Sequence, residues 1–192
     1  MLDDYATHGI DNILALAGDP PLDGSPVAGE FSYALELVEL VRDRGDFSIG
    51  VAAFPENHPR SPDRDTDRRH LAAKLALADY AITQFFYDVD DYRRLMDELD
   101  ALDVRKPVIP GVLPPTNPSS VRRFSAVNGS RTPDALLARI DAAGPDDQLR
   151  IATDAATELC QALLEAGAPG LHLYTLNRAD AAVGILANLS AT

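Results

Sequence analysis

Cysteine and positive charge are scarce in this sequence, and long hydrophobic runs are missing from it. The one cysteine, Cys160, cannot form an internal disulfide, which indicates a reducing, cytoplasmic setting. It lies in an apolar helical pattern, so we interpret it as a small buried hydrophobic residue. No apolar run approaches the roughly 20 residues of a membrane span. The amino terminus also lacks the basic and apolar regions of a signal peptide.

The scarcity of positive charge limits the class of partner. Only 17 lysines and arginines stand against 30 aspartates and glutamates, which gives a formal net charge of -13. Nucleic acids and anionic membrane surfaces are themselves negatively charged, so this balance argues against either as the main partner.

The rest of the composition is that of an ordinary globular protein. The chain is 46% hydrophobic and 24% charged. Its 192 residues suffice for one sizeable domain and are few for two. No internal repeat or low-complexity linker is visible, so we expect residues 1–192 to form a single domain.

Strand patterns and helix patterns alternate along the chain. The expected strands are 12–18, 47–54, 80–86, 106–113 and 170–176. The expected helices are 32–44, 65–77, 89–102, 119–127, 133–142, 147–166 and 178–189, after a short helical segment at 3–8. Such alternation predicts an α/β fold with parallel strands joined by helical crossovers.

The number of strands limits the architecture. Five strands cannot close an eight-stranded barrel, yet no strand carries the features of an exposed sheet edge. The chain also begins abruptly, a short helix before its first strand. We therefore predict a partial TIM barrel that contains strands 4 to 8 with their helices and lacks the first three units. A self-contained, open five-stranded sheet is the alternative.

Polar side chains follow every expected strand. The most informative segment is Tyr80–Asp88, in which Thr83 and Gln84 interrupt a run that a buried parallel strand would keep apolar. The other polar residues at strand ends are Asp19, Glu56, His58, Thr116, Asn117, Asn177 and Arg178. The carboxyl ends of parallel strands are where α/β proteins build their sites, so this pattern predicts a site there. Loops are polar in any case, and Gln84 capping a neighbouring loop is the simpler alternative.

Five segments resemble the methylenetetrahydrofolate reductase family, and they occur in the family's order and spacing. They are 12–21 (NILALAGDPP), 51–59 (VAAFPENHP), 81–88 (AITQFFYD), 109–117 (IPGVLPPTN) and 171–179 (LHLYTLNRA). The resemblance implies a TIM barrel of which this chain corresponds to the fourth strand onward. It also implies a cytoplasmic oxidoreductase of one-carbon metabolism and methionine biosynthesis, acting as a possible homo-oligomer. The family reduces 5,10-methylenetetrahydrofolate to 5-methyltetrahydrofolate with NADH or NADPH, usually through FAD, as a flavoprotein.

The resemblance implies folate-binding roles for four residues. Asp19 matches the aspartate that hydrogen-bonds the pterin, and its carboxylate can stabilise the cationic iminium formed when the substrate ring opens, which makes it the catalytic candidate. Gln84 matches the glutamine that binds the pterin through an amide donor and acceptor. Phe124 matches a phenylalanine that packs against folate, and Arg178 an arginine that approaches it.

Each of these assignments has a plainer alternative. Asp19 precedes Pro20 and is also a common turn residue. Phe124 would look the same as a core aromatic of an amphipathic helix. Arg178 would look the same as a helix-capping or ion-pairing arginine.

The resemblance places the flavin on the first two strand exits and the helix after them. The matching residues are Ala17, Gly18, Asp19, Phe54, His58, Asp67, His70 and Lys74. Among them, Asp67, His70 and Lys74 have helical spacing, so one face could present all three. An ordinary solvated charged face is the alternative. The histidines lack partners at metal-ligand spacing, so we expect no metal site.

Departures from the family pattern argue against flavin binding. Many members have arginine where this chain has Ala17, and tyrosine where it has Phe54. The first change removes a cation and the second a hydroxyl donor. Direct hydride transfer from NADH to the folate is the alternative. The family's general acid, a glutamate, precedes the matched region; Glu30 and Glu56 are the conceivable substitutes here.

Two functions remain open from the sequence. The first is a methylenetetrahydrofolate reductase, with the activity of the isolated chain left open. The second is a non-catalytic folate- or nucleotide-binding half-barrel that needs a partner chain.

Overall fold

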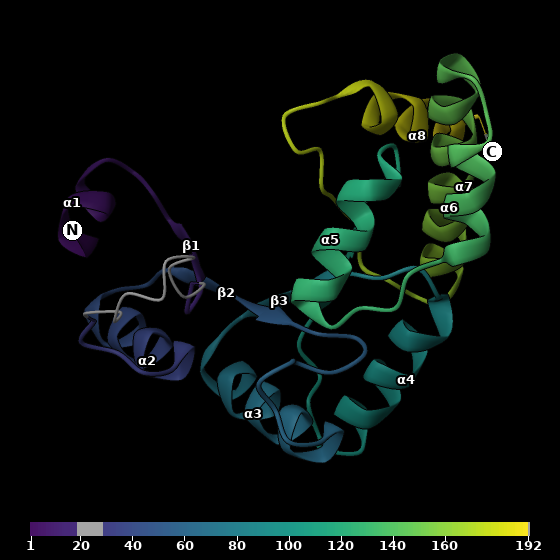
Figure 1. The fold of residues 1–192 in the computed structure, drawn as a ribbon. Helices are drawn as coiled ribbons and strands as arrows, with labels where there is room; N and C mark the ends of the chain where they lie inside the picture. The colour runs from purple at the N-terminus through teal and green to yellow at the C-terminus, as the bar shows by residue number, and fades with distance from the viewer. Residues whose placement is uncertain (19–28, 192) are drawn as a thin grey trace.

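The structure, a computed structural model, describes residues 1–18 and 29–191. Within them the strands form one parallel sheet whose spatial order follows the chain, β1-β2-β3-β4-β5. Their bounds are β1 (Asn12–Ala15), β2 (Ser48–Ala53), β3 (Tyr80–Phe85), β4 (Val108–Val112) and β5 (His172–Leu173). The order has no reversal of the kind seen in doubly wound sheets. The sheet instead curls as an open arc (Figure 1).

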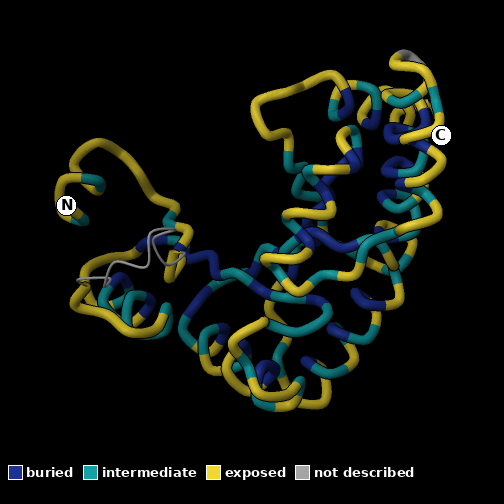
Figure 2. The backbone as a smooth tube through the Cα atoms, in the orientation of Figure 1, coloured by how far each residue is buried: buried dark blue, intermediate teal, exposed yellow. Residues whose placement is uncertain are grey.

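Four helices cover the outer face of this arc. They are α2 (Ala34–Arg44), α3 (Arg64–Leu77), α4 (Val89–Asp100) and α7 (Pro145–Glu165). The core lies between these helices and the strands, and it contains Val38, Val41, Ile49, Val51, Leu71, Leu75, Tyr92, Leu95, Leu99 and Leu163. Buried stretches of chain follow the strands and the sheet-facing sides of the helices (Figure 2). Each helix is therefore the crossover that returns the chain to a parallel strand.

The remaining helices lie at the two ends of the arc. The first, α1 (Leu2–Thr7), precedes β1, whereas α5 (Pro118–Asn128), α6 (Asp134–Asp141) and α8 (Asp180–Ser190) gather with α7 beyond β4 (Figure 1). A second apolar cluster of Ile140, Ile151 and Ala152 packs α6 against α7. The described helices include none that combines the length and the apolar character that a membrane span requires.

Helix caps fix how the chain leaves three of the strands. The Asp63 carboxylate accepts a bond from Thr66 N at 2.7 Å before α3, and Asp88 accepts one from Asp90 N at 3.0 Å before α4. Asn117 does the same for α5, with Pro118 at the first helical position. Gly129, with φ 69°, ends α5 in the left-handed conformation. These caps hold the edge where the carboxyl ends of the strands lie.

The two faces of the sheet differ in burial. Ala15, Val51 and Ala81 pair across neighbouring strands and are buried against the helices. Leu14, the neighbour of Ala15, points to the opposite face and is 44% exposed. Because side chains alternate along a strand, this opposite face is the concave inner surface of the arc.

These findings confirm the α/β prediction as a curled, five-stranded parallel half-barrel. One strand is much shorter than predicted, since β5 covers only His172–Leu173 of the expected 170–176. Tyr174 N still donates to Val112 O at 2.9 Å. The backbone then turns at Leu176 and Asn177, where φ is 48° and 64°. That turn ends the strand and begins the link to α8.

Candidate functional site

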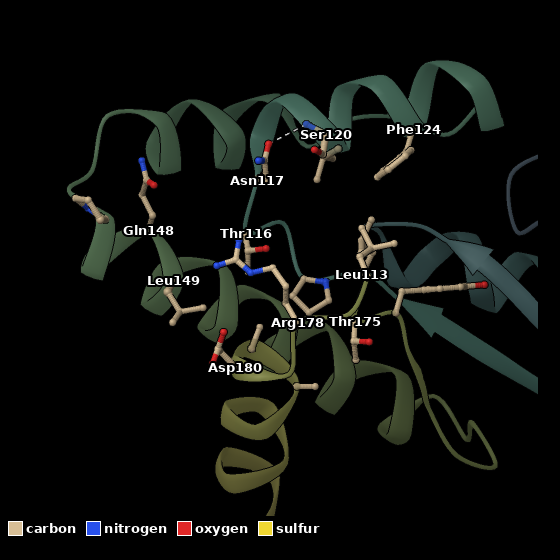
Figure 3. A pocket seen from close by; sticks show the side chains of 17 residues that line it. Leu113, Thr116, Asn117, Ser120, Phe124, Gln148, Leu149, Thr175, Arg178 and Asp180 are labelled. Carbon is tan, nitrogen blue, oxygen red and sulfur yellow. Dashed lines mark hydrogen bonds between the residues drawn. The ribbon is translucent and has the colours of Figure 1, made fainter. Parts of the chain in front are cut away.

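A cavity of about 520 Å³ opens beyond the carboxyl end of β4 (Figure 3). Its walls come from α5, the first turn of α7 and the link from β5 to α8. Polar lining residues are Thr116, Asn117, Ser120, Gln148, Thr175, Arg178 and Asp180, and apolar ones include Leu113, Val121, Phe124, Leu149, Tyr174 and Leu176. Its size and mixed lining are those of a small-molecule site.

Two of the predicted folate-binding residues meet in this cavity. Phe124 reaches it from α5 and Arg178 from the β5–α8 link (Figure 3). Phe124 is half-buried, and the Arg123 guanidinium carbon lies 4.9 Å from the centre of its ring. Arg178 is exposed, with its backbone N–H donating to Thr175 O at 2.9 Å. The cavity thus presents an aromatic face and a guanidinium, which suit a ligand with a flat ring and an acidic group.

Gln84 does not line this cavity, but the backbone carbonyl of its neighbour Thr83 is bonded to a residue that does. The Tyr174 hydroxyl, on the cavity wall, donates to Thr83 O at 3.0 Å. Burial raises the pKa of Tyr174, so the phenol keeps the proton that it donates. Gln84 Oε1 accepts a bond from Phe85 N at 3.0 Å.

This local bond of Gln84 has a structural cause. The β3–β4 ladder is irregular between Ile82 and Phe85. There the Thr83 hydroxyl oxygen accepts from Gly111 N at 2.8 Å in place of a regular ladder bond. Side chains thus replace backbone partners where β3 ends, which accounts for polar residues in an otherwise apolar strand.

The predicted cofactor residues Phe54 and His58 lie together on the link that follows β2. Their ring centroids are 4.5 Å apart in an edge-to-face arrangement. His58 Nδ1 accepts a bond from Arg60 N at 3.0 Å. Burial lowers the pKa of His58, with Arg60 adding to the effect and Asp67 opposing it. The neutral ring that this favours carries its proton on Nε2, where it can donate to a ligand.

Asp67 and Lys74 have contacts in this neighbourhood, and His70 lies on the same helix at the surface. Asp67 is buried and accepts bonds from Ser61 Oγ at 3.3 Å and from Arg68 Nη1 at 2.7 Å. Lys74 Nζ donates to Ala52 O at 2.8 Å, and burial lowers its pKa against the opposing charge of Asp67. His70 is exposed on α3. Two of the three residues with helical spacing are thus held by side-chain bonds, while the third faces solvent.

The remaining predicted cofactor residues follow β1. Ala17 and Gly18 are exposed, and Gly18 has a φ of 74°. Asp19 lies outside the described residues. Within residues 1–18 and 29–191, no group of three or more histidine, cysteine, aspartate or glutamate side chains could hold a metal ion.

Sequence reasoning missed a buried arginine that shapes the β2–α3 link. Arg68 donates to Phe54 O at 3.0 Å and to Pro55 O at 2.8 Å. Its Nε also donates to a Glu98 carboxylate oxygen at 2.6 Å. Arg68 shares its helix face with Leu71, three residues on, and an arginine within such an apolar stripe was the available signal.

The link also carries Glu56, considered above as a substitute general acid. Arg131 donates to the Glu56 carboxylate from its backbone N at 2.9 Å and from its Nε at 2.9 Å. These bonds direct the Glu56 carboxylate toward Arg131, so the geometry gives the acid role no support. Glu30, the other substitute considered, is exposed.

A family model and several known proteins that match this chain are all of methylenetetrahydrofolate reductase. The family model of methylenetetrahydrofolate reductase matches residues 1–190. Methylenetetrahydrofolate reductase 2 of Saccharomyces cerevisiae is 39% identical, over 99% of this chain and 34% of that protein. The 5,10-methylenetetrahydrofolate reductase of Escherichia coli is 36% identical, over 95% of this chain and 62% of that protein. Methylenetetrahydrofolate reductase (NADH) 1 of Arabidopsis thaliana is 35% identical, over 98% of this chain and 35% of that protein.

The chain therefore spans 34% to 62% of the length of these relatives. Among solved structures, an uncharacterized protein from Clostridium thermocellum, described as binding two copies of 5-methyl-5,6,7,8-tetrahydrofolic acid, has a similar fold. The TM-score is 0.54 at 16% identity, over 79% of this chain and 56% of that one. At this identity the likeness concerns the fold alone.

Proposed function

Since this chain belongs to the methylenetetrahydrofolate reductase family, we propose that it takes part in reducing 5,10-methylenetetrahydrofolate to 5-methyltetrahydrofolate. NADH or NADPH is the hydride donor, and the reaction serves one-carbon metabolism and methionine biosynthesis. The observation that carries the proposal is the cavity that brings Phe124 and Arg178 together at the carboxyl end of the sheet. The cytoplasmic location and a homo-oligomeric state remain predictions.

The half-barrel corresponds, in this proposal, to strands 4 to 8 of the family's TIM barrel. Support comes from the strand order, which follows the chain without reversal as neighbouring strands of a barrel do. The family model matches residues 1–190, so the correspondence would hold along nearly the whole chain.

The folate is the proposed ligand of the cavity. Phe124 would stack on an aromatic part of the folate, and Arg178 would pair with a carboxylate of its glutamate tail. Gln84 would read the pterin edge from the neighbouring strand, exchanging its bond to Phe85 N for one to the ring. A folate-binding protein with a similar fold adds support. The Asp19 carboxylate would stabilise the positive charge of the iminium.

The β2–α3 link and α3 fit the phosphate-bearing part of a dinucleotide. The Lys74 ammonium supplies a cation, while His58 supplies a ring N–H beside it. When bound there, FAD supplies a carrier that takes a hydride from the nicotinamide and passes it to the folate. Ala17 and Phe54 still lack the cation and the hydroxyl common in the family, so FAD binding is itself to be tested.

The test separates binding from turnover. Titration calorimetry with 5-methyltetrahydrofolate should give saturable binding that weakens at least about tenfold in Phe124→Ala and Arg178→Ala. NADH oxidation that depends on 5,10-methylenetetrahydrofolate should accompany it. Binding without turnover would favour the non-catalytic half-barrel. Failure to bind folate would remove the cavity as its site.

The cofactor has a readout of its own. The absorbance spectrum of the purified protein should show flavin, and Lys74→Met should lower the FAD content per chain. Folate-dependent NADH oxidation by flavin-free protein would instead establish direct hydride transfer.

A further inference from the structure

Two carboxylates at the carboxyl edge of the sheet are largely buried although they come from different strand exits. The side chain of Glu56, on the β2–α3 link, is 14% exposed. That of Asp91, in the first turn of α4, is only 2% exposed. Buried charges are costly unless they are paired and hydrogen-bonded, so each of these groups needs a cation.

Arg131 meets both carboxylates at once. Besides the bonds that its backbone N and its Nε donate to Glu56, its Nη2 donates to Asp91 Oδ2 at 2.6 Å and lies 3.8 Å from Asp88 Oδ2. Arg94 contacts the other oxygen of Asp91. A guanidinium can serve two acceptors from fixed directions, which an ammonium on a flexible stem cannot do. We call Arg131, Glu56 and Asp91 the Arg131 clamp.

The clamp lies just after the carboxyl end of α5, the helix that forms one wall of the cavity. Gly129 reverses the chain after α5, and Ser130 N donates back to Ser125 O at 3.1 Å. The Ser130 hydroxyl donates to Phe85 O, at the end of β3, at 3.4 Å. Arg131 follows directly. One short segment therefore ties α5, the wall that carries Phe124, to the exits of β2 and β3.

We propose that Arg131 is a positioning residue that couples the α5 wall of the cavity to the β2–α3 link. The link carries Phe54 and His58, the predicted cofactor side, and α5 carries Phe124, the predicted folate side. Their relative position decides whether a hydride donor and a folate meet. The coupling thus rests on the proposed function, while the clamp itself rests on the contacts alone.

The exposure of the three clamp residues indicates which part of the structure should change when Arg131 is replaced. The Arg131 side chain is 66% exposed, so its pairing should add little to the global stability of the fold. Its two acceptors are buried, and without Arg131 they lose a cation and tend to move toward water. The expected result is local displacement of the link and of α5 rather than unfolding.

The test compares Arg131→Met with Arg122→Met as a matched control. Arg122 lies on α5 and pairs with Asp141 of α6 at 3.0 Å, so Arg122→Met removes the same charge nine residues earlier in the chain without touching the link. Amide hydrogen exchange is followed in residues 54–61 and 118–128 without ligand, and 5-methyltetrahydrofolate affinity is then measured. Arg131→Met should speed exchange in both segments by about tenfold or more, with Arg122→Met within about twofold of wild type.

The affinity readout follows the same order. Arg131→Met should raise the Kd for 5-methyltetrahydrofolate by at least about fivefold, Arg131→Lys by less because it keeps the charge, and Arg122→Met hardly at all. In the double variant with Glu56→Gln, the exchange effects should be less than additive, since both changes break one contact.

Two results would overturn the proposal. One is faster exchange confined to residues 129–133 in Arg131→Met, with the link unchanged. The other is an equal effect of Arg122→Met on both segments. If wild-type protein fails to bind folate, the proposed function fails, whereas the exchange comparison still decides whether the clamp couples the two walls.

Discussion

At the scale of single residues, Leu176 combines strain with exposure at the cavity. Its φ of 48° lies in the left-handed region, and its side chain, 56% exposed, lines the cavity. A non-glycine residue there costs roughly 1–2 kcal/mol. Holding a large apolar side chain in this state suits contact with a ligand.

Leu176→Gly and Leu176→Ala separate the two properties. Both remove the side chain, but only glycine removes the strain, so the glycine variant should be the more stable by about 1 kcal/mol in urea denaturation. Both should weaken binding of 5-methyltetrahydrofolate to a similar degree. An alanine variant as stable as the glycine variant would mean that the turn stores no strain.

His58 gives a pH dependence of stability whose sign follows from its lowered pKa. The unfolded chain takes up a proton near pH 6.5, but the folded chain does so only at lower pH. The unfolded state therefore binds more protons in that window, and stability falls as pH drops from 6.5 toward the folded pKa. Above pH 6.5 the contribution of His58 is fully present.

Thermal unfolding between pH 8 and pH 5 tests this in His58→Asn. The asparagine side chain still offers an acceptor to Arg60 N but does not titrate. Below pH 6.5 the Tm of this variant should therefore fall less than that of wild type. His70→Asn is the control, because the His70 ring is exposed, and its curve should follow wild type. Parallel curves for all three proteins would contradict a role of His58 burial.

The residue scale also shows what the sequence could not predict. Phe124 and Arg178 were accessible from motif resemblance, and the structure brings them into one cavity. The contact of Arg131 with Glu56 joins positions 75 residues apart. The sequence pattern around neither residue predicts it. Long-range charge pairing depends on how loops meet at the sheet edge, which periodicity does not encode.

At the scale of elements, the contact of β3 with β4 depends on a missing side chain. A Cβ on Gly111 would lie 2.3 Å from Thr83 O and 2.6 Å from the Tyr174 ring. The same glycine donates its N–H to the Thr83 hydroxyl. Any side chain would therefore push β4 away from β3, which carries Gln84, and away from the Tyr174 ring.

Gly111→Ala should destabilise the fold by about 3 kcal/mol in urea denaturation, because the β3 backbone on one side and the Tyr174 ring on the other must shift. Gly170→Ala is the matched control, since nothing lies within 4 Å of the added carbon. It should change the free energy of unfolding by less than about 1 kcal/mol. Equal effects of the two changes would show that β4 can move without cost.

Elements were the most predictable level. The expected helix at 133–142 appears as α6 (Asp134–Asp141), because its apolar residues Leu137 and Ile140 bury one face. The end of the last strand was not predictable to the same degree. Apolar residues continue through Leu176, so periodicity favours a strand, whereas the positive φ values there depend on the turn that the link to α8 requires.

At the scale of the whole molecule, the concave face of the sheet exposes apolar side chains at its β1 end. Leu14 is 44% exposed on this face, and Leu16, two residues further on, is 50% exposed. Neighbouring exposed leucines on a sheet favour association with other apolar surfaces.

Leu14→Gln should therefore lower the binding of an apolar dye and any concentration-dependent association seen by sedimentation, with little change in Tm. Leu95→Ala, on α4 in the core between the helices and the sheet, should cost about 3 kcal/mol instead. A large loss of Tm in Leu14→Gln would mean that the concave face is covered in solution.

The strand order has a consequence for how the chain can fold while it is being synthesised. Each strand pairs with the one made just before it, so β2 finds β1 in place, and β3 finds β2. Among the described strands, each new strand can therefore pair with one that has already been synthesised. A chain leaving the ribosome can thus add one strand–helix unit after another to a growing arc, and each new unit has its template ready before the next is translated.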